Sequence, residues 1–128
     1  ITPPMKNVLK LEELGLLLLF TMAYFRFFPG HLGLYAGLFF VPDVSFALYL
    51  VSPAAGAAAY NVLHHKGVIA SLILAGLILH NDMMIMVGLI FMSHSSFDRV
   101  FGYGLKYADS FDHTHLGWIG KSAQKNMD

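Results

Sequence analysis

Polar side chains interrupt the most apolar part of this chain. The stretch YNVLHHKG stands between PAAGAAA and VIASLILAGLIL and contains Asn61 and His64. Asn61 and His64 are three residues apart, and His94 and Asp98 are four apart, so each pair projects from one face of a helix. Histidine nitrogens and carboxylate oxygens without thiolates are ligands that suit zinc, manganese or iron. The residue types therefore favour a metal site within an apolar environment.

The elements that must position these residues are four apolar segments followed by a polar tail. Each segment approaches the ~20 apolar residues that a membrane helix needs. Links as short as FPGH, VSP and HND make consecutive helices antiparallel. We therefore predict an all-α integral membrane protein, an antiparallel four-transmembrane-helix bundle whose polar C-terminal tail folds at the cytoplasmic interface. The chain forms a single membrane domain, 1–128, with helices over about 11–28, 32–51, 53–79 and 83–105 and an interfacial tail over 106–128.

Composition supports a membrane protein and excludes several functions. Of the 128 residues, 56% are hydrophobic and 12% are charged, about half the charged share of soluble domains. The formal net charge is zero, which argues against nucleic acid as a partner because phosphate backbones attract a basic surplus. The chain has no cysteine, so disulfides and thiolate catalysis are excluded.

Lysine and arginine placement predicts the orientation in the membrane. Cytoplasmic loops carry an excess of these residues. The side that holds both termini carries Lys6, Lys10, Arg99, Lys106, Lys121 and Lys125, whereas the other side has only Arg26. We predict a multi-pass protein of the cytoplasmic (inner) membrane, with both termini in the cytoplasm.

The predicted hairpins bring the polar residues to one depth. If the third and fourth helices turn at about Asn81, His64 lies level with Asp98. If the second and third turn at about Ser52, Asp43 lies within one helical turn of His64. Charged groups at this depth cost ~2.5–3.5 kcal/mol each on insertion scales, so they need partners or a hydrated cavity. The sequence thus predicts one polar layer shared by several helices.

From this layer we predict His64, His94 and Asp98 as metal ligands and Asp43 as a further ligand or a catalytic general base. Asn61 would orient a ligand. The tail motif DHTH adds His115, predicted as a catalytic acid or fourth ligand that closes the site.

A rival interpretation makes the same residues a structural network. Asp43 and Asp98 would then form buried salt bridges with Lys66 and Arg99 that hold the helices in register. His65 and Lys66 follow His64 directly, so on a regular helix they face elsewhere, for example toward a second chain.

Several strings resemble a known family. SHSSFDRVFGYGLKY followed by FDHTHLGWIG resembles the C-terminal signature of small bacterial membrane proteins grouped as the domain of unknown function 4260 family. FFVPDVS, AAYNVLHH and LEELGLLLL resemble its other motifs. The resemblance implies a compact bacterial integral membrane protein and supplies no activity.

Three functions fit these observations. The first is a metal-dependent, membrane-embedded hydrolase acting on a lipid or other apolar substrate. The second is an accessory subunit of a larger membrane complex that binds haem or pigment through its histidines. The third is a proton- or ion-conducting bundle. Membrane lipids are the expected partners, together with further copies of the chain or other subunits.

Overall fold

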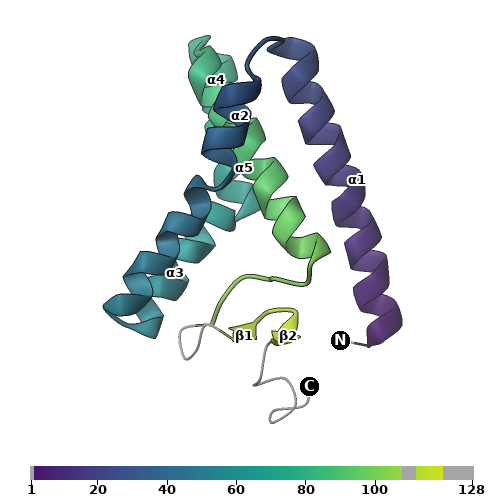
Figure 1. Cartoon of the computed structure of the whole chain (residues 1–128), viewed down its shortest axis with the longest axis vertical. Helices are drawn as coiled ribbons and strands as arrows, with labels where there is room; N and C mark the ends of the chain where they lie inside the picture. Colours follow the sequence, from purple (N-terminus) through teal and green to yellow (C-terminus); the bar gives the residue numbers. More distant parts are fainter. Residues whose placement is uncertain (1, 108–111, 120–128) are drawn as a thin grey trace.

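A computed structural model of the chain describes residues 2–107 and 112–119, apart from the side chain of His113 (Figure 1). Within this part the fold is helical, which confirms the all-α expectation. The elements are α1 (Pro3–Phe27), α2 (Leu32–Phe39), the 3₁₀ helix η1 (Val41–Leu50), α3 (Pro53–His64), α4 (Lys66–Leu79), α5 (Asp82–Val100), β1 (His113–Thr114) and β2 (Gly117–Trp118). Lys121 and Lys125, and with them the end of the predicted tail, lie outside the described residues.

The first helix begins well before the predicted residue 11. Thr2 is the N-cap, and its hydroxyl accepts a hydrogen bond from the backbone N–H of Met5. Pro3 and Pro4 occupy the first turn, where a missing N–H costs nothing and the fixed φ suits a helix. The apolar pattern alone could not reveal this polar, capped first section, so the prediction placed the start too late.

The two middle segments are each broken rather than continuous. After α2 the chain continues as η1, because Pro42 lacks the N–H that an α-helix needs and disfavours the α conformation of the residue before it. The third predicted helix divides into α3 and α4, bent by 46°. The break lies at His65, whose backbone is extended and whose Nδ1 accepts the N–H of Val68 as the N-cap of α4.

α5 is the central helix and packs against both α1 and α4 (Figure 1). Its first half joins a buried core made by Tyr24, Phe39, Met86, Leu89 and Ile90. α3 lies along η1, and the two approach closely at Gly56, where any Cβ would collide with the Tyr49 ring. This approach brings the start of η1 beside the end of α3.

After α5 the chain turns back beneath the helices. Gly102, with φ of 88°, makes the turn that only glycine adopts without strain. An antiparallel β1–β2 pair follows, and Lys106 forms a β-bridge with Thr114. This small sheet lies at the same end of the molecule as the start of α1 (Figure 1).

Within the described residues, one segment is long and apolar enough to cross a membrane by itself, namely Leu32–Leu50. α3 and α4 pass the same test when they are taken together as one bent span. Large hydrophobic side chains are nevertheless exposed outside these segments too, including Leu18, Leu19 and Met22 on α1.

Candidate metal centre

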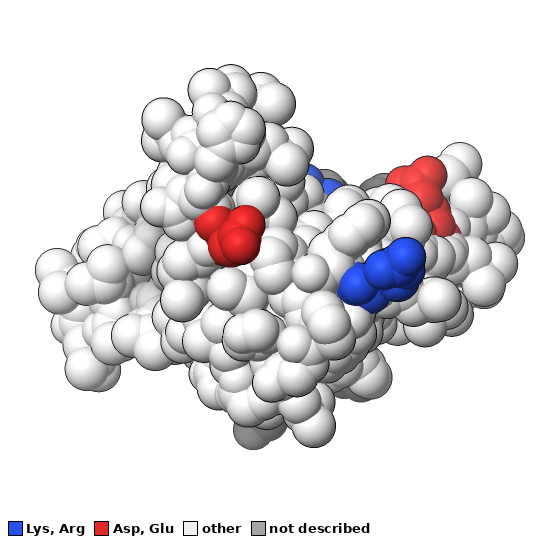
Figure 2. Space-filling model, turned by 90° about the horizontal axis from the view of Figure 1, so that it is seen from above, with Lys and Arg blue, Asp and Glu red and all other residues white. Residues whose placement is uncertain are grey.

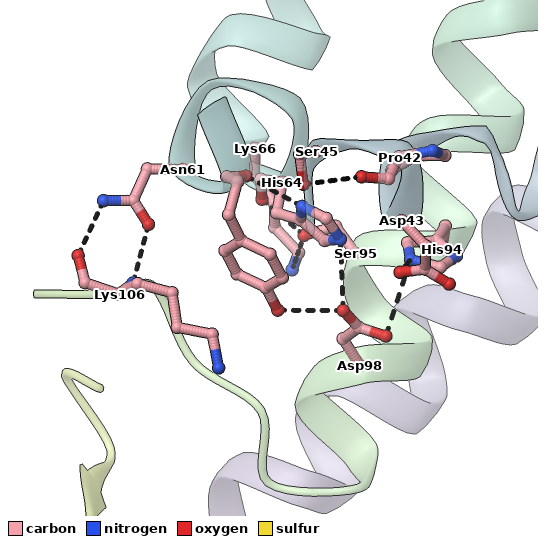
Figure 3. A network of polar contacts seen from close by, with 11 residues as sticks. Pro42, Asp43, Ser45, Asn61, His64, Lys66, His94, Ser95, Asp98 and Lys106 are labelled. Carbon is pink, nitrogen blue, oxygen red and sulfur yellow. Dashed lines mark hydrogen bonds and ion pairs between the residues drawn. The ribbon is translucent and has the colours of Figure 1, made fainter. Parts of the chain in front are cut away.

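Four side chains from three elements converge where η1, α3 and α5 meet (Figure 3). Asp43 comes from the first turn of η1, His64 is the last residue of α3, and His94 and Asp98 lie on one face of α5. One ligand atom from each of the four lies within 4.8 Å of all the others. The structure therefore brings together the three predicted metal ligands and Asp43.

The distances in this His/Asp cluster fit ion pairs between imidazoles and carboxylates, and they also fit ligands around one ion. His64 Nε2 lies 3.1 Å from Asp98 Oδ2, and His94 Nε2 lies 3.2 Å from Asp43 Oδ1 and 3.5 Å from Asp98 Oδ1. Neighbouring ligands of a tetrahedral zinc ion with bonds of ~2.0–2.1 Å are separated by ~3.3 Å. Within the described residues, neither Nε2 atom makes a hydrogen bond of acceptable angle.

Tyr60, which lies one helical turn before His64, fixes two members of the cluster. The Tyr60 hydroxyl donates a hydrogen bond to Asp98 Oδ2 at 2.9 Å. His64 Nδ1 donates to the backbone oxygen of Tyr60 at 2.8 Å, and the two rings stack with centroids 3.8 Å apart. A neutral His64 therefore carries its proton on Nδ1 and presents an Nε2 lone pair to the cluster. Such a hydrogen bond orients the imidazole as metal-binding histidines require.

The four side chains of the cluster differ in their exposure to solvent. The side chains of His64 and His94 are 2% and 1% exposed, Asp98 is 13% exposed and Asp43 is 36% exposed. Asp43 and Asp98 also line a cavity of about 270 Å³, together with Phe46, Tyr60, Tyr103 and Lys106. The histidines thus anchor the cluster from inside, and the carboxylates face the space that a small molecule could enter.

Lys106 is a part of the site that sequence reasoning did not assign to it. Asn61 holds its backbone in both directions: Asn61 Nδ2 donates to the Lys106 oxygen at 2.8 Å, and the Lys106 N–H donates to Asn61 Oδ1 at 2.6 Å. The Lys106 ammonium lies 5.0 Å from the centre of the Tyr60 ring. Burial lowers the pKa of Lys106 to about 8, although the charges of Asp98 and Asp112 oppose the shift. Asn61 thus positions the cavity wall, whereas we had predicted that it would orient a metal ligand.

Lys66 forms an ion pair, but with a different partner from those in the rival interpretation. Its ammonium lies 2.9 Å from Glu13 Oε2 of α1 and donates to Ser95 Oγ at 3.2 Å. Ser95 Oγ in turn donates to the backbone oxygen of His64 at 2.7 Å. The bend at His65 turns Lys66 toward α1 and α5, whereas we had predicted that it would face elsewhere on a regular helix. The two charges of opposite sign in the apolar helices were the sequence signal for this pair.

His115 lies apart from the His/Asp cluster. Its Nδ1 accepts a hydrogen bond from the backbone N–H of Leu105 at 2.8 Å, and its ring lines a separate cavity beside α1. Burial and the positive charge of Arg99 lower the pKa of His115, which favours the neutral ring. The side chain of His113, the other histidine of the DHTH motif, lies outside the described part of the chain.

The structure thus defines a helical protein with a buried cluster of two histidines and two aspartates where α3, η1 and α5 meet. Residues 6–119 match the family described as Domain of unknown function (DUF4260), and the chain belongs to this family. The match confirms the resemblance that the sequence motifs indicated. Comparison with curated proteins and with solved structures returned no match.

Proposed function

We propose that this protein is a membrane-embedded, metal-dependent hydrolase. One observation carries the proposal: four ligand atoms from Asp43, His64, His94 and Asp98 lie within 4.8 Å of one another, and both imidazoles are buried. Zinc, manganese and iron all accept this combination of nitrogen and oxygen ligands.

The charge of the cluster supports a divalent cation. Two carboxylates with two neutral imidazoles carry a charge of −2, and burying such a charge without compensation is costly. Lys66 does not supply the compensation because its ammonium pairs with Glu13, and Lys106 in the cavity wall brings one positive charge against two negative ones. A divalent ion would neutralise the cluster and give both Nε2 lone pairs a partner.

The residues divide naturally into ligands and a base. His64, His94 and Asp98 would hold the ion, which would polarise the scissile group and lower the pKa of a bound water. Asp43 is the most exposed member and lines the cavity, so it would take the proton from the attacking water. For an ester, the water oxygen bonds to the acyl carbon, the C–O bond breaks, and the proton passes to the leaving alcohol.

The surroundings support an apolar substrate and a multi-pass membrane location. The end of the molecule in Figure 2 has only isolated charges. At the other end, where the β1–β2 pair lies (Figure 1), Lys6, Lys10 and Arg99 line one cavity with Trp118, and Lys106 bridges to Thr114. By the positive-inside rule this second end, with the N-terminus, would face the cytoplasm. A lipid in the surrounding bilayer could then reach the cavity beside Asp43 laterally.

Among the alternatives, haem or pigment binding through both histidines has less support. The His64 and His94 rings are only 5.0 Å apart between centroids. A macrocycle ligated from both sides would need the two rings on opposite faces of a flat gap, with each nitrogen ~2 Å from the metal. A proton-conducting role would use the same residues without a bound ion.

Elemental analysis of the purified full-length protein tests the proposal. We expect about one transition-metal ion per chain in the wild type, loss of that ion in His64→Ala, and loss of ester hydrolysis in the same variant. The matched control is His80→Asn, which removes an exposed histidine at a left-handed position (φ 53°) that asparagine also adopts. Full metal content in His64→Ala would overturn the metal centre, and metal without hydrolysis of any lipid ester would overturn the enzymatic role.

A further inference from the structure

A second cavity lies between the start of α1, the end of α5 and the β1–β2 turn. Its volume is about 340 Å³, and none of its lining residues belongs to the His/Asp cluster. It lies at the end of the molecule where the positive-inside rule predicts the cytoplasmic membrane surface.

Three cations line this cavity from two helices. Lys6 and Lys10 are four residues apart on α1, so they share a face, and Arg99 comes from the last turn of α5. None of these three side chains forms an ion pair or hydrogen bond within the described residues. Of the two acidic residues in the wall, Glu13 is already paired with Lys66, which leaves Glu12. The cavity therefore has a positive surplus.

The rest of the wall supplies a hydrogen-bond donor and an apolar surface. Because His115 Nδ1 accepts the Leu105 N–H, a neutral His115 ring has its proton on Nε2 and can donate from there. Leu9, Phe101 and Leu116 form apolar parts of the same wall. A site with cations at one side and hydrocarbon at the other suits an anionic amphiphile.

We propose that this cavity binds the phosphate headgroup of an anionic lipid, with the phosphate among Lys6, Lys10 and Arg99 and the first part of an acyl chain against Leu9 and Phe101. Arginine and lysine are the side chains that bind phosphate groups, and basic pockets between helices at the cytoplasmic side of a membrane recognise anionic headgroups. The volume is at the small end for ligand pockets, which fits a headgroup rather than a whole lipid. This inference rests on the proposed membrane location and is independent of the proposed metal chemistry.

The chain contains its own probe for this site. Trp118 is the only tryptophan in the sequence and it lines the cavity, so its fluorescence should report occupancy. Titration of the detergent-purified full chain with dihexanoyl phosphatidic acid should give a saturable change. Dihexanoyl phosphatidylcholine, which has no net charge, should bind at least about tenfold more weakly, because it lacks the charge that the three cations attract. Inorganic phosphate should also bind more weakly, because it lacks the acyl chain.

Three arginine variants on α1 and α5 separate a built site from general charge attraction. Arg99→Gln should weaken binding of the phosphatidic acid about tenfold or more, and Arg99→Lys should weaken it less. The control is Arg26→Gln, which removes a cation from the last turn of α1, at the other end of that helix, and should leave the affinity unchanged. His64→Ala should also bind normally, so a failed metal centre would not affect this test.

The proposal is overturned if the wild type shows no saturable change, or if Arg26→Gln weakens binding as much as Arg99→Gln. Equal affinity for phosphatidylcholine would exclude recognition of the anionic headgroup. Equal affinity for inorganic phosphate would mean that the cavity recognises free phosphate and not a lipid.

Discussion

Both halves of α5 contain fully buried side chains, but of different chemical kinds. Residues 82–92 contribute Met86, Leu89 and Ile90 to the apolar core around Tyr24 and Phe39. Residues 93–100 bury polar groups instead: Ser93, His94, Ser95 and Ser96 are at most 1% exposed. Burial by itself therefore does not distinguish the core from the site in this helix.

Hydrogen bonding of the buried groups does distinguish the core half of α5 from the site half. Apolar side chains in the first half need only close packing. In the second half, Ser93 and Ser95 donate to backbone oxygens of Leu89 and His64, but both ring nitrogens of His94 lack a hydrogen bond within the described residues. Unsatisfied buried polar groups are rare in native proteins and call for a functional explanation. Bound metal would supply the missing partner of Nε2.

Substitution of one buried residue in each half should separate folding stability from metal binding. Ile90→Ala should lower the free energy of unfolding by about 2–5 kcal/mol, because the side chain is fully buried, while metal still binds at saturation. His94→Gln should abolish stoichiometric metal binding, because an amide replaces the imidazole, and should lower the stability of the metal-free protein less than Ile90→Ala does. Elemental analysis and denaturant unfolding followed by circular dichroism measure the two effects. Loss of metal in Ile90→Ala at saturation would show that the halves are not separable.

Removal of two tyrosine hydroxyls tests the same comparison, with a smaller expected change in metal binding. Tyr60→Phe removes the donor to Asp98 and should lower metal affinity about 10–100-fold, the usual effect of groups that orient a ligand. Tyr35→Phe removes a hydroxyl that is hydrogen-bonded to Thr21 at 2.7 Å, beside the apolar half, and should leave metal affinity unchanged. Competition with a chelator of known affinity provides the measurement. An unchanged affinity in Tyr60→Phe would separate Asp98 from the metal.

A third test of the same comparison is a titration at the mouth of the polar half. The pKa of Lys106 is lowered by burial from 10.5 to about 8. Between these values the unfolded chain binds more protons than the folded chain, so the free energy of unfolding of the metal-free protein should rise with pH over that window. Lys106→Met should remove this rise. NMR of ¹³C-dimethylated lysine would give the titration midpoint directly, and a midpoint near 10.5 would contradict the burial of the ammonium.

Helix periodicity and short links between helices supported two predictions about the polar layer. His94 and Asp98 share a face because they are four residues apart, and the antiparallel hairpins placed His64 and Asp43 at the same depth. These relations depend on the rise per residue and on where the chain reverses, both of which are readable in the sequence. The all-helical architecture and the family membership were readable for the same reason, because each lies in the local pattern of residues.

The direction in which each side chain points around its helix axis was not readable from the sequence. A break in a helix changes this direction for the residues that follow it. The bend at His65 turns Lys66 toward Glu13 and Ser95, and the 3₁₀ turn after Pro42 aims Asp43 at His94. Asn61 binds the backbone of Lys106, 45 residues later, and His115 binds Leu105 instead of joining the His/Asp cluster. The sequence by itself determined which residues share a depth. Only the tertiary structure decided which of them meet, because contacts between distant segments depend on the packing of whole helices.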